Sequence, residues 1–165
     1  MLTQERLKEL LHYNPETGIF TWKTTKGRMR EGNHPGTITE KGYLRFQIDG
    51  KAYLSHRVAW LHVYGVFPED QIDHINRIKD DNRITNLREA TNNLNQCNMS
   101  KRLPNSSSKY RGVGLHKSSG KWRAYVSFKG KGFSLGLHNT PEDAAKAYNI
   151  KAKELFGKFA YLNDV

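Results

Sequence analysis

The most informative stretch of this 165-residue chain is DHINRIKDDNRITNLREATNNLN, residues 73–95. It places an acid beside a histidine and follows them with amide side chains at short intervals. Histidine has a pKa near neutrality and can take a proton from water, while an asparagine amide can hold its ring in one tautomer. Carboxylate and amide oxygens are ligands that hard cations such as Mg²⁺ and Mn²⁺ accept. These residue types suit the cleavage of a phosphodiester, although the chemistry alone is compatible with many arrangements.

The order of these residues resembles that of HNH endonucleases of phages and mobile introns. The shared features are Asp-His-Ile-Asn at 73–76, the run Asp-Asn-Arg-Ile-Thr-Asn-Leu-Arg-Glu-Ala-Thr at 81–91, and a later asparagine. The resemblance extends over about residues 3–98. It implies an α+β fold with a ββα-metal (His-Me finger) site, in which a strand bearing Asp-His is followed by a loop, a second strand and a helix.

Four residues take functional roles in this resemblance. His74 is the general base, and Asn86 orients it. Asp73 and Asn95 bind one divalent cation per chain, Mg²⁺ or Mn²⁺, and Asn95 falls on the short helix after the second strand. No small-molecule cofactor is implied.

The chain departs from the family pattern at Arg77, because glycine usually follows Asp-His-Ile-Asn. The arginine would change the loop or add a phosphate contact. Upstream, His-Arg-Val-Ala-Trp at 56–60 resembles the helix that precedes the site in this family. We assign Arg57 and Arg77 to DNA contacts, and His56 would either touch DNA or start its helix. Asp81 and Arg83 are interpreted as a structural pair within the loop.

Residues 1–50 are expected to form an N-terminal helix and β-hairpin region of the nuclease, and residues 51–100 its ββα-metal core. Thr3 is the expected N-cap of the first helix. Alternation and turn residues predict the remaining elements, with a loop over 26–42. The expected elements are a helix over 3–11, strands over 19–22, 42–48 and 51–54 joined by an Asp-Gly turn, and a helix over 55–64 ended by Gly65.

The positive charge is concentrated in the last part of the chain. The net charge is +11, and residues 1–100 hold 14 basic and 12 acidic side chains, whereas residues 101–165 hold 13 and 4. Such a surface favours a polyanion, most simply DNA, over a merely solubilising face or a basic helix on a membrane. The most apolar stretch, 58–67, is too short to span a membrane. The single cysteine is typical of a reducing compartment, here the cytoplasm of a bacterial or phage-infected cell.

Residues 108–165 are predicted to form a second domain after a polar linker at 101–107. Alternating stretches predict three antiparallel strands packed by one helix. The expected strands cover 110–116, 121–128 and 132–138. The helix has Thr140 as N-cap, Pro141 at its first position, and Gly157 at its end.

This second domain resembles the APETALA2-type DNA-binding domain. The resemblance lies in Tyr-Arg-Gly-Val at 110–113, Gly-Lys-Trp-Arg-Ala-Tyr-Val at 120–126, Thr-Pro-Glu-Asp-Ala-Ala at 140–145 and Ala-Tyr-Leu-Asn at 160–163. It implies that the sheet lies in the major groove of double-stranded DNA with the helix behind it. The side chains assigned to DNA are Arg111, Arg123 and Tyr125, with Lys121, Lys129 and Lys131 near phosphates.

Together these patterns favour a site-specific, metal-dependent DNA endonuclease of the homing type that carries its own DNA-binding domain. One metal site per chain implies one nick per protomer, so cutting both strands would take a transient dimer on DNA or a second event. The alternative is a non-catalytic DNA-binding regulator that uses the HNH fold as a scaffold. An RNA-binding protein is disfavoured because no aromatic stacking motif of the common RNA modules is present.

Overall fold

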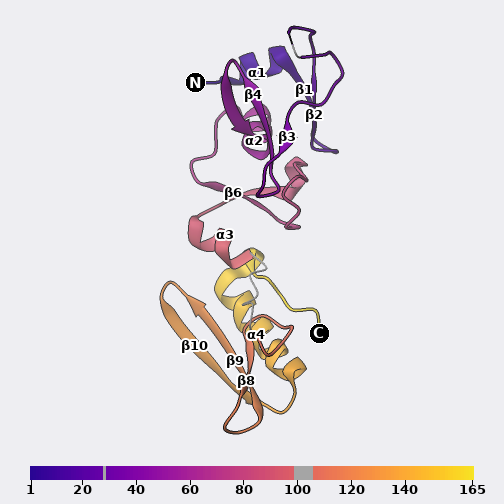
Figure 1. Ribbon diagram of the computed structural model, residues 1–165. Helices are drawn as coiled ribbons and strands as arrows, with labels where there is room; N and C mark the ends of the chain where they lie inside the picture. The colour runs from indigo at the N-terminus through magenta and orange to yellow at the C-terminus, as the bar shows by residue number, and fades with distance from the viewer. Residues whose placement is uncertain (28, 99–105) are drawn as a thin grey trace. The chain divides into compact units, whose positions relative to one another are not determined.

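The computed structural model describes residues 1–27, 29–98 and 106–165 (Figure 1). The chain divides into two compact units, Met1–Thr91 and Asn92–Val165. Both combine helices with small antiparallel sheets, which confirms the α+β class. Residues 101–105 of the predicted linker at 101–107 lie outside the described residues. No helix in the described part of the chain is both long and apolar enough to cross a membrane.

The first unit opens with helix α1 (Gln4–Leu10), followed directly by strands β1 (Leu11–Asn14) and β2 (Ile19–Trp22). The hydroxyl of Thr3 accepts a hydrogen bond from the Arg6 amide at 3.2 Å, so the predicted N-cap is confirmed. The sequence placed Leu11 in this helix, but it begins β1 and is fully buried. Strand β1 has four residues, which is too short for alternation to be told from helical spacing.

A three-stranded sheet of order β3-β4-β5 comes next, from strands β3 (Thr37–Ile38), β4 (Leu44–Ile48) and β5 (Lys51–Leu54). Asp49 and Gly50 have φ of 48° and 77°, so both adopt the left-handed backbone that a tight hairpin turn needs. The predicted Asp-Gly hairpin is therefore confirmed. The predicted loop over 26–42 also contains the short strand β3.

Helix α2 (Ser55–Tyr64) follows β5 and ends at Gly65, whose φ is 80°, as predicted. It buries Val58, Ala59 and Leu61 against the core of the first unit, which also contains Leu7, Leu10, Leu11, Tyr13, Phe20, Phe46, Ile48 and Ile72. The unit closes with strands β6 (Gln71–His74) and β7 (Leu87–Ala90), paired antiparallel, with the 3-10 turn η1 (Ile84–Asn86) before β7. The core of the first unit therefore lies against strand β6, which carries Asp73 and His74.

The second unit contains helix α3 (Asn92–Asn98), a sheet of order β10-β9-β8 and helix α4 (Pro141–Phe156), which ends in the 3-10 turn η2 (Gly157–Phe159). The strands are β8 (Val113–His116), β9 (Lys121–Phe128) and β10 (Lys131–His138). Helix α4 packs on this sheet through Ala144 and Ala145. The hydroxyl of Thr140 accepts from the Asp143 amide, so the predicted helix start is confirmed.

Helix α3 falls in the second unit, whereas β6 and β7 belong to the first. The packing of a helix against these two strands, which a ββα-metal site requires, therefore stays a prediction. Asn95 lies on α3, the short helix expected to carry it.

A substitution at Gly18 tests the contact between the β1–β2 turn and the loop that joins β6 to β7. Its φ is 75°, and an added Cβ would collide with the backbone of Asn82 and Arg83. We expect Gly18→Ala to lower the free energy of unfolding of the first unit by at least about 2 kcal/mol, because it adds overpacking to a left-handed backbone. Gly50→Ala is the control, since Gly50 has φ 77° and open space around it. Equal losses in denaturant titrations of the two variants would contradict this contact.

Candidate functional site

Asp73 is held by a buried ion pair across the β6–β7 sheet. It lies directly opposite Arg88 in the register, and Oδ2 of Asp73 accepts hydrogen bonds from Nε and Nη2 of Arg88 at 2.8 and 2.5 Å. The two side chains are 6% and 9% exposed. A pair this buried fixes the carboxylate in one orientation, because losing either partner would leave a charge without compensation.

His74 is the last residue of β6 and is only 4% exposed. Its Nε2 lies 3.4 Å from Oδ1 of Asn82, which is a long contact for a hydrogen bond. Burial lowers the pKa of His74, and the contact with Asn82 and the charge of Asp73 oppose this shift. The imidazole is therefore neutral at pH 7 and can accept a proton.

Asn82 reaches His74 because the loop between β6 and β7 is anchored on the β1–β2 hairpin. The main-chain carbonyl of Asn82 accepts a hydrogen bond from the Tyr13 hydroxyl at 2.7 Å, and its amide group donates to the carbonyl of Asp80 at 3.0 Å. Asn82 is 1% exposed. No role was predicted for this residue, since an asparagine in an asparagine-rich run carries no signal of its own.

Asn86 ties the two ends of the loop together. Its Oδ1 accepts from the Asn76 amide at 2.9 Å, and its Nδ2 donates to the carbonyl of Asp81 at 2.8 Å. Its own carbonyl accepts from the Ile75 amide at 2.9 Å, directly after His74. Asn86 thus acts on the backbone that follows His74, and the predicted contact with the imidazole stays a prediction.

Asp81 and Arg83 form the structural pair expected from the sequence. Nη2 of Arg83 lies 2.5 Å from Oδ2 of Asp81, and Asn76 Nδ2 donates to the same oxygen at 2.6 Å. The hydrogen bond from Arg83 is the main cause that lowers the pKa of Asp81 to about 2. Asp81 therefore stays ionised and closes the loop under physiological conditions.

His56 lies in the first turn of α2, as one of its two expected roles required, and it is only 5% exposed. The N-cap of this helix is Leu54, which makes no side-chain capping hydrogen bond. Its ring meets that of His74 edge-on, with centroids 5.1 Å apart and planes at 88°. Tyr43 packs on both rings, at 5.2 Å from His56 and 6.0 Å from His74. The sequence analysis did not predict this packing, and a DNA contact of His56 stays a prediction.

The two arginines assigned to DNA in this unit have different surroundings. Arg57 donates to the carbonyls of Pro68 and Asp70, both at 3.0 Å, and so supports the segment that leads into β6. Arg77 closes a turn, because its amide donates to the carbonyl of His74 at 2.9 Å, and its φ is 68°. This left-handed backbone explains why glycine suits the position. DNA contacts of both residues stay predictions.

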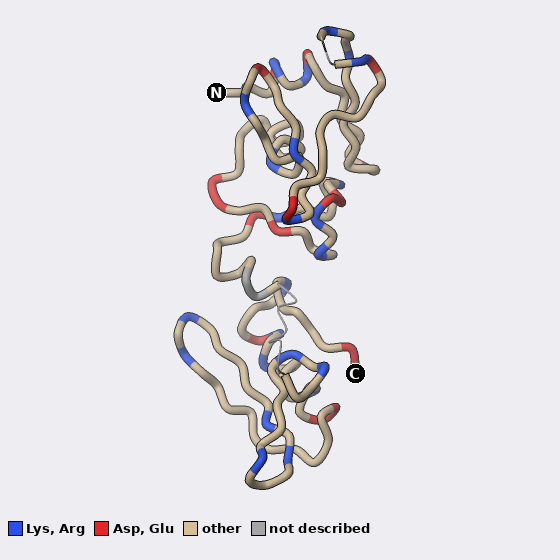
Figure 2. The backbone as a smooth tube through the Cα atoms, in the orientation of Figure 1, with Lys and Arg blue, Asp and Glu red and all other residues tan. Residues whose placement is uncertain are grey.

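The open face of the second sheet is basic and aromatic. Along β9, Lys121, Arg123 and Tyr125 are exposed, while Ala124 and Val126 are buried. This pattern confirms the predicted alternation of the strand. Basic residues also occupy the hairpin turns of this sheet, with few acidic ones beside them (Figure 2).

Tyr125 and Arg123 form the centre of this face. The Arg123 guanidinium lies over the Tyr125 ring at 5.9 Å. A Cβ on Gly132 would collide with the phenol of Tyr125, so the ring lies across that glycine on the neighbouring strand. Lys131, the first residue of β10, is exposed beside them. The sheet therefore presents a positioned aromatic ring with cations around it.

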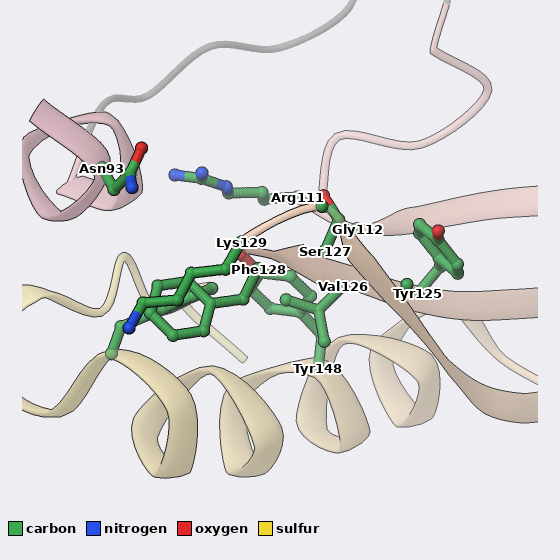
Figure 3. Close-up of a pocket in the computed structure, with 12 residues that line it drawn as sticks. Asn93, Arg111, Gly112, Tyr125, Val126, Ser127, Phe128, Lys129 and Tyr148 are labelled. Atoms are coloured by element: carbon green, nitrogen blue, oxygen red, sulfur yellow. The ribbon is translucent and has the colours of Figure 1, made fainter.

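Arg111 lines a cavity of about 520 Å³ in the second unit. Its side chain extends toward Asn93 of α3, and Lys129 and Tyr148 also border the cavity (Figure 3). The backbone of Arg111 is fixed because its amide donates to Oδ1 of Asn163 at 2.7 Å, while Nδ2 of Asn163 donates to its carbonyl at 3.1 Å. The expected DNA contact of Arg111 stays a prediction.

The buried histidine predicts an acid-sensitive first unit. Burial is the main cause that lowers the pKa of His56 to about 3, followed by the charges of His74 and Arg57. The unfolded chain binds this proton near pH 6.5, so the contribution to stability is complete above that pH and is lost as the pH falls toward 3. We expect a loss of up to about 2 kcal/mol from His56 between pH 6.5 and 5.

Unfolding titrations at pH 7 and pH 5 measure this effect. The variant His56→Phe should show a smaller loss than the wild type. Both proteins retain His62 and His74, whose pKa values burial also lowers, so the difference between the two proteins reports mainly on His56. An equal loss in the two proteins would show that His56 is not kept neutral by the fold.

Arg77→Gly and Arg77→Ala separate backbone strain from charge. Both remove the guanidinium, but only glycine relieves the left-handed φ of 68°. We expect the glycine variant to be more stable than the alanine variant by about 0.5–1 kcal/mol, after allowing for the greater freedom of glycine in the unfolded chain. Chemical denaturation measures the difference, and an alanine variant as stable as the glycine variant would rule out strain at this turn.

Comparison with known proteins supports both halves of the chain. The HNH endonuclease family matches residues 53–97, and the AP2 domain family matches residues 108–158. An uncharacterised HNH endonuclease of Acanthamoeba polyphaga mimivirus is 36% identical over 117 residues, which cover 70% of this chain and 59% of the relative. No solved structure matches.

Two ethylene-responsive transcription factors of Arabidopsis thaliana, one of them described as AP2-like, are each 45% identical over 58 residues. These residues make up 34% of this chain, and 14% and 17% of the two relatives. The chain thus spans less than two thirds of the length of each of these three relatives. The matched segments contain the two sites described above, so the chain joins a segment similar to HNH endonucleases to a C-terminal segment similar to AP2 domains.

Proposed function

We propose that this protein is a metal-dependent DNA endonuclease of the site-specific homing type, with His74 as general base. The observation that carries the proposal is the end of strand β6, where Asp73 is fixed on Arg88 and His74 is buried beside it in contact with Asn82. Both residues lie within the segment that matches the HNH endonuclease family.

In the proposed reaction, His74 takes a proton from the water whose oxygen bonds to phosphorus. The bond from phosphorus to one deoxyribose oxygen breaks, and this leaving oxygen takes a proton from solvent. A neutral imidazole is needed for this step, which is why the burial that lowers its pKa matters. Asn86 and Asn82 serve the step indirectly. Asn86 fixes the backbone after His74, and Asn82 faces the imidazole nitrogen.

The donor set fits a hard cation such as Mg²⁺ or Mn²⁺. Among residues 1–27, 29–98 and 106–165, no three side chains of His, Cys, Asp or Glu cluster as a metal site. Mg²⁺ is commonly bound by one or two carboxylates together with phosphate oxygens of the substrate. We propose that Asp73 and Asn95 supply oxygen ligands of this kind. When bound, the cation would stabilise negative charge on the phosphate.

The second unit would supply affinity for double-stranded DNA. We propose that its open sheet face lies in the major groove, with Arg123 and Tyr125 toward bases and Lys121, Lys129 and Lys131 toward phosphates. Linking this face to the nuclease raises the local concentration of DNA at His74 without any new contact. Two chains on one duplex would be needed to cut both strands at once.

His74→Ala tests the base. We expect nicking of supercoiled plasmid by the wild-type protein with Mg²⁺ or Mn²⁺ and none with EDTA, and a rate at least about 100-fold lower in His74→Ala, since general bases contribute about 10²–10⁴-fold. DNA affinity should stay within twofold. His12→Ala, at an exposed histidine on β1, is the control and should nick normally. DNA binding without nicking under any metal would instead support a regulator.

Arg123→Ala tests the sheet face. We expect binding to a cognate site to weaken by about 1–3 kcal/mol, because a bidentate base contact is lost, while binding to unrelated DNA changes less. The control is Lys146→Ala, since Lys146 is an exposed cation on α4 beside Asp143 and lies on the other side of the sheet. Fluorescence anisotropy with both DNAs measures the effect. An equal change in the two variants would argue against major-groove reading by this face.

A further inference from the structure

The fold places one more histidine beside His74. His56 is the second residue of α2, and its ring contacts those of both Tyr43 and His74. All three rings are within the usual distance of aromatic pairs. The orientation of the His74 ring thus depends on His56 as well as on the long contact with Asn82.

The Nδ1 atom of His56 is a buried polar atom with no hydrogen-bond partner among the described residues. Such an atom costs about 1–3 kcal/mol of stability, and an apolar ring of similar shape would avoid this cost. A histidine at this position is therefore unfavourable for folding alone. Polar groups that work against stability are concentrated at functional sites.

An imidazole offers a polar nitrogen where a phenyl ring has none. The His56 ring meets the His74 ring edge-on, with centroids 5.1 Å apart and planes at 88°. The unpartnered Nδ1 atom therefore belongs to the ring that contacts the proposed base.

We propose that His56 is a positioning residue for His74, which holds the ring plane of the base through this edge-on contact and through its own polar nitrogen. This inference rests on the proposed function. It predicts that stability and activity respond in opposite directions to an apolar ring at position 56.

The test is His56→Phe in the full chain, with three measurements on each protein. Thermal unfolding at pH 7 should show a melting temperature equal to or above that of the wild type. DNA affinity should stay within twofold. The single-turnover nicking rate at saturating DNA with Mg²⁺ should fall at least tenfold. A rate within twofold of the wild type would overturn the proposal, because packing alone would then suffice.

Two further substitutions at position 56, which are similar in size to each other, test the proposal if the phenylalanine variant does not fold. His56→Asn retains a polar atom near the Nδ1 position, whereas His56→Leu has a similar volume and none. We expect the asparagine variant to nick at least tenfold faster than the leucine variant even where the leucine variant is the more stable. Equal rates, or a faster leucine variant, would overturn the proposal.

The outcome for His74 separates this inference from the proposed function. If His74→Ala nicks normally, the assignment of the base is wrong. If His74→Ala is inactive while His56→Phe is fully active, the proposed function stands and only the role of His56 fails.

Discussion

The ion pair between Asp73 and Arg88 is the interaction on which the proposed site depends. The two residues are direct partners in the β6–β7 register, and both are buried. Side chains alternate along a strand, so a slip of one residue would turn His74 to the opposite face of this two-stranded sheet. Breaking a buried pair on one side costs about 3–5 kcal/mol, which is enough to fix the register of a sheet with only four residues per strand. The position of His74, the proposed base, is therefore set by the ion pair of the adjacent Asp73.

Amide side chains stabilise the loop between these strands, in addition to Ile84, which packs against the core. Asn76, Asn82 and Asn86 hydrogen-bond to side chains and main-chain groups of the same loop. A short loop of this kind has no core of its own, so such bonds are what gives it one conformation. A rigid loop keeps the proposed base in place before DNA arrives, and the positively charged second unit would bring the DNA.

Local signals in the sequence were sufficient for much of the fold. The caps at Thr3 and Thr140, the Asp-Gly hairpin at 49–50 and the alternation along β9 depend on neighbouring residues, and all are confirmed. The family resemblance was confirmed because its motifs cover both halves of the chain. Tertiary packing was harder to predict from the sequence. The contact of His56 with His74 joins residues 18 apart whose elements face each other only after the first unit has folded, and no local pattern encodes it.

The most direct measurement is a double-mutant cycle on the free energy of unfolding of Asp73→Asn, Arg88→Met and the variant with both changes. If the buried pair sets the β6–β7 register, each single change will be strongly destabilising and the pair will show a coupling energy of at least about 2 kcal/mol. The double variant will then be more stable than the sum of the single losses predicts. Strictly additive losses would contradict this account, because the position of His74 would then have to be maintained by other contacts.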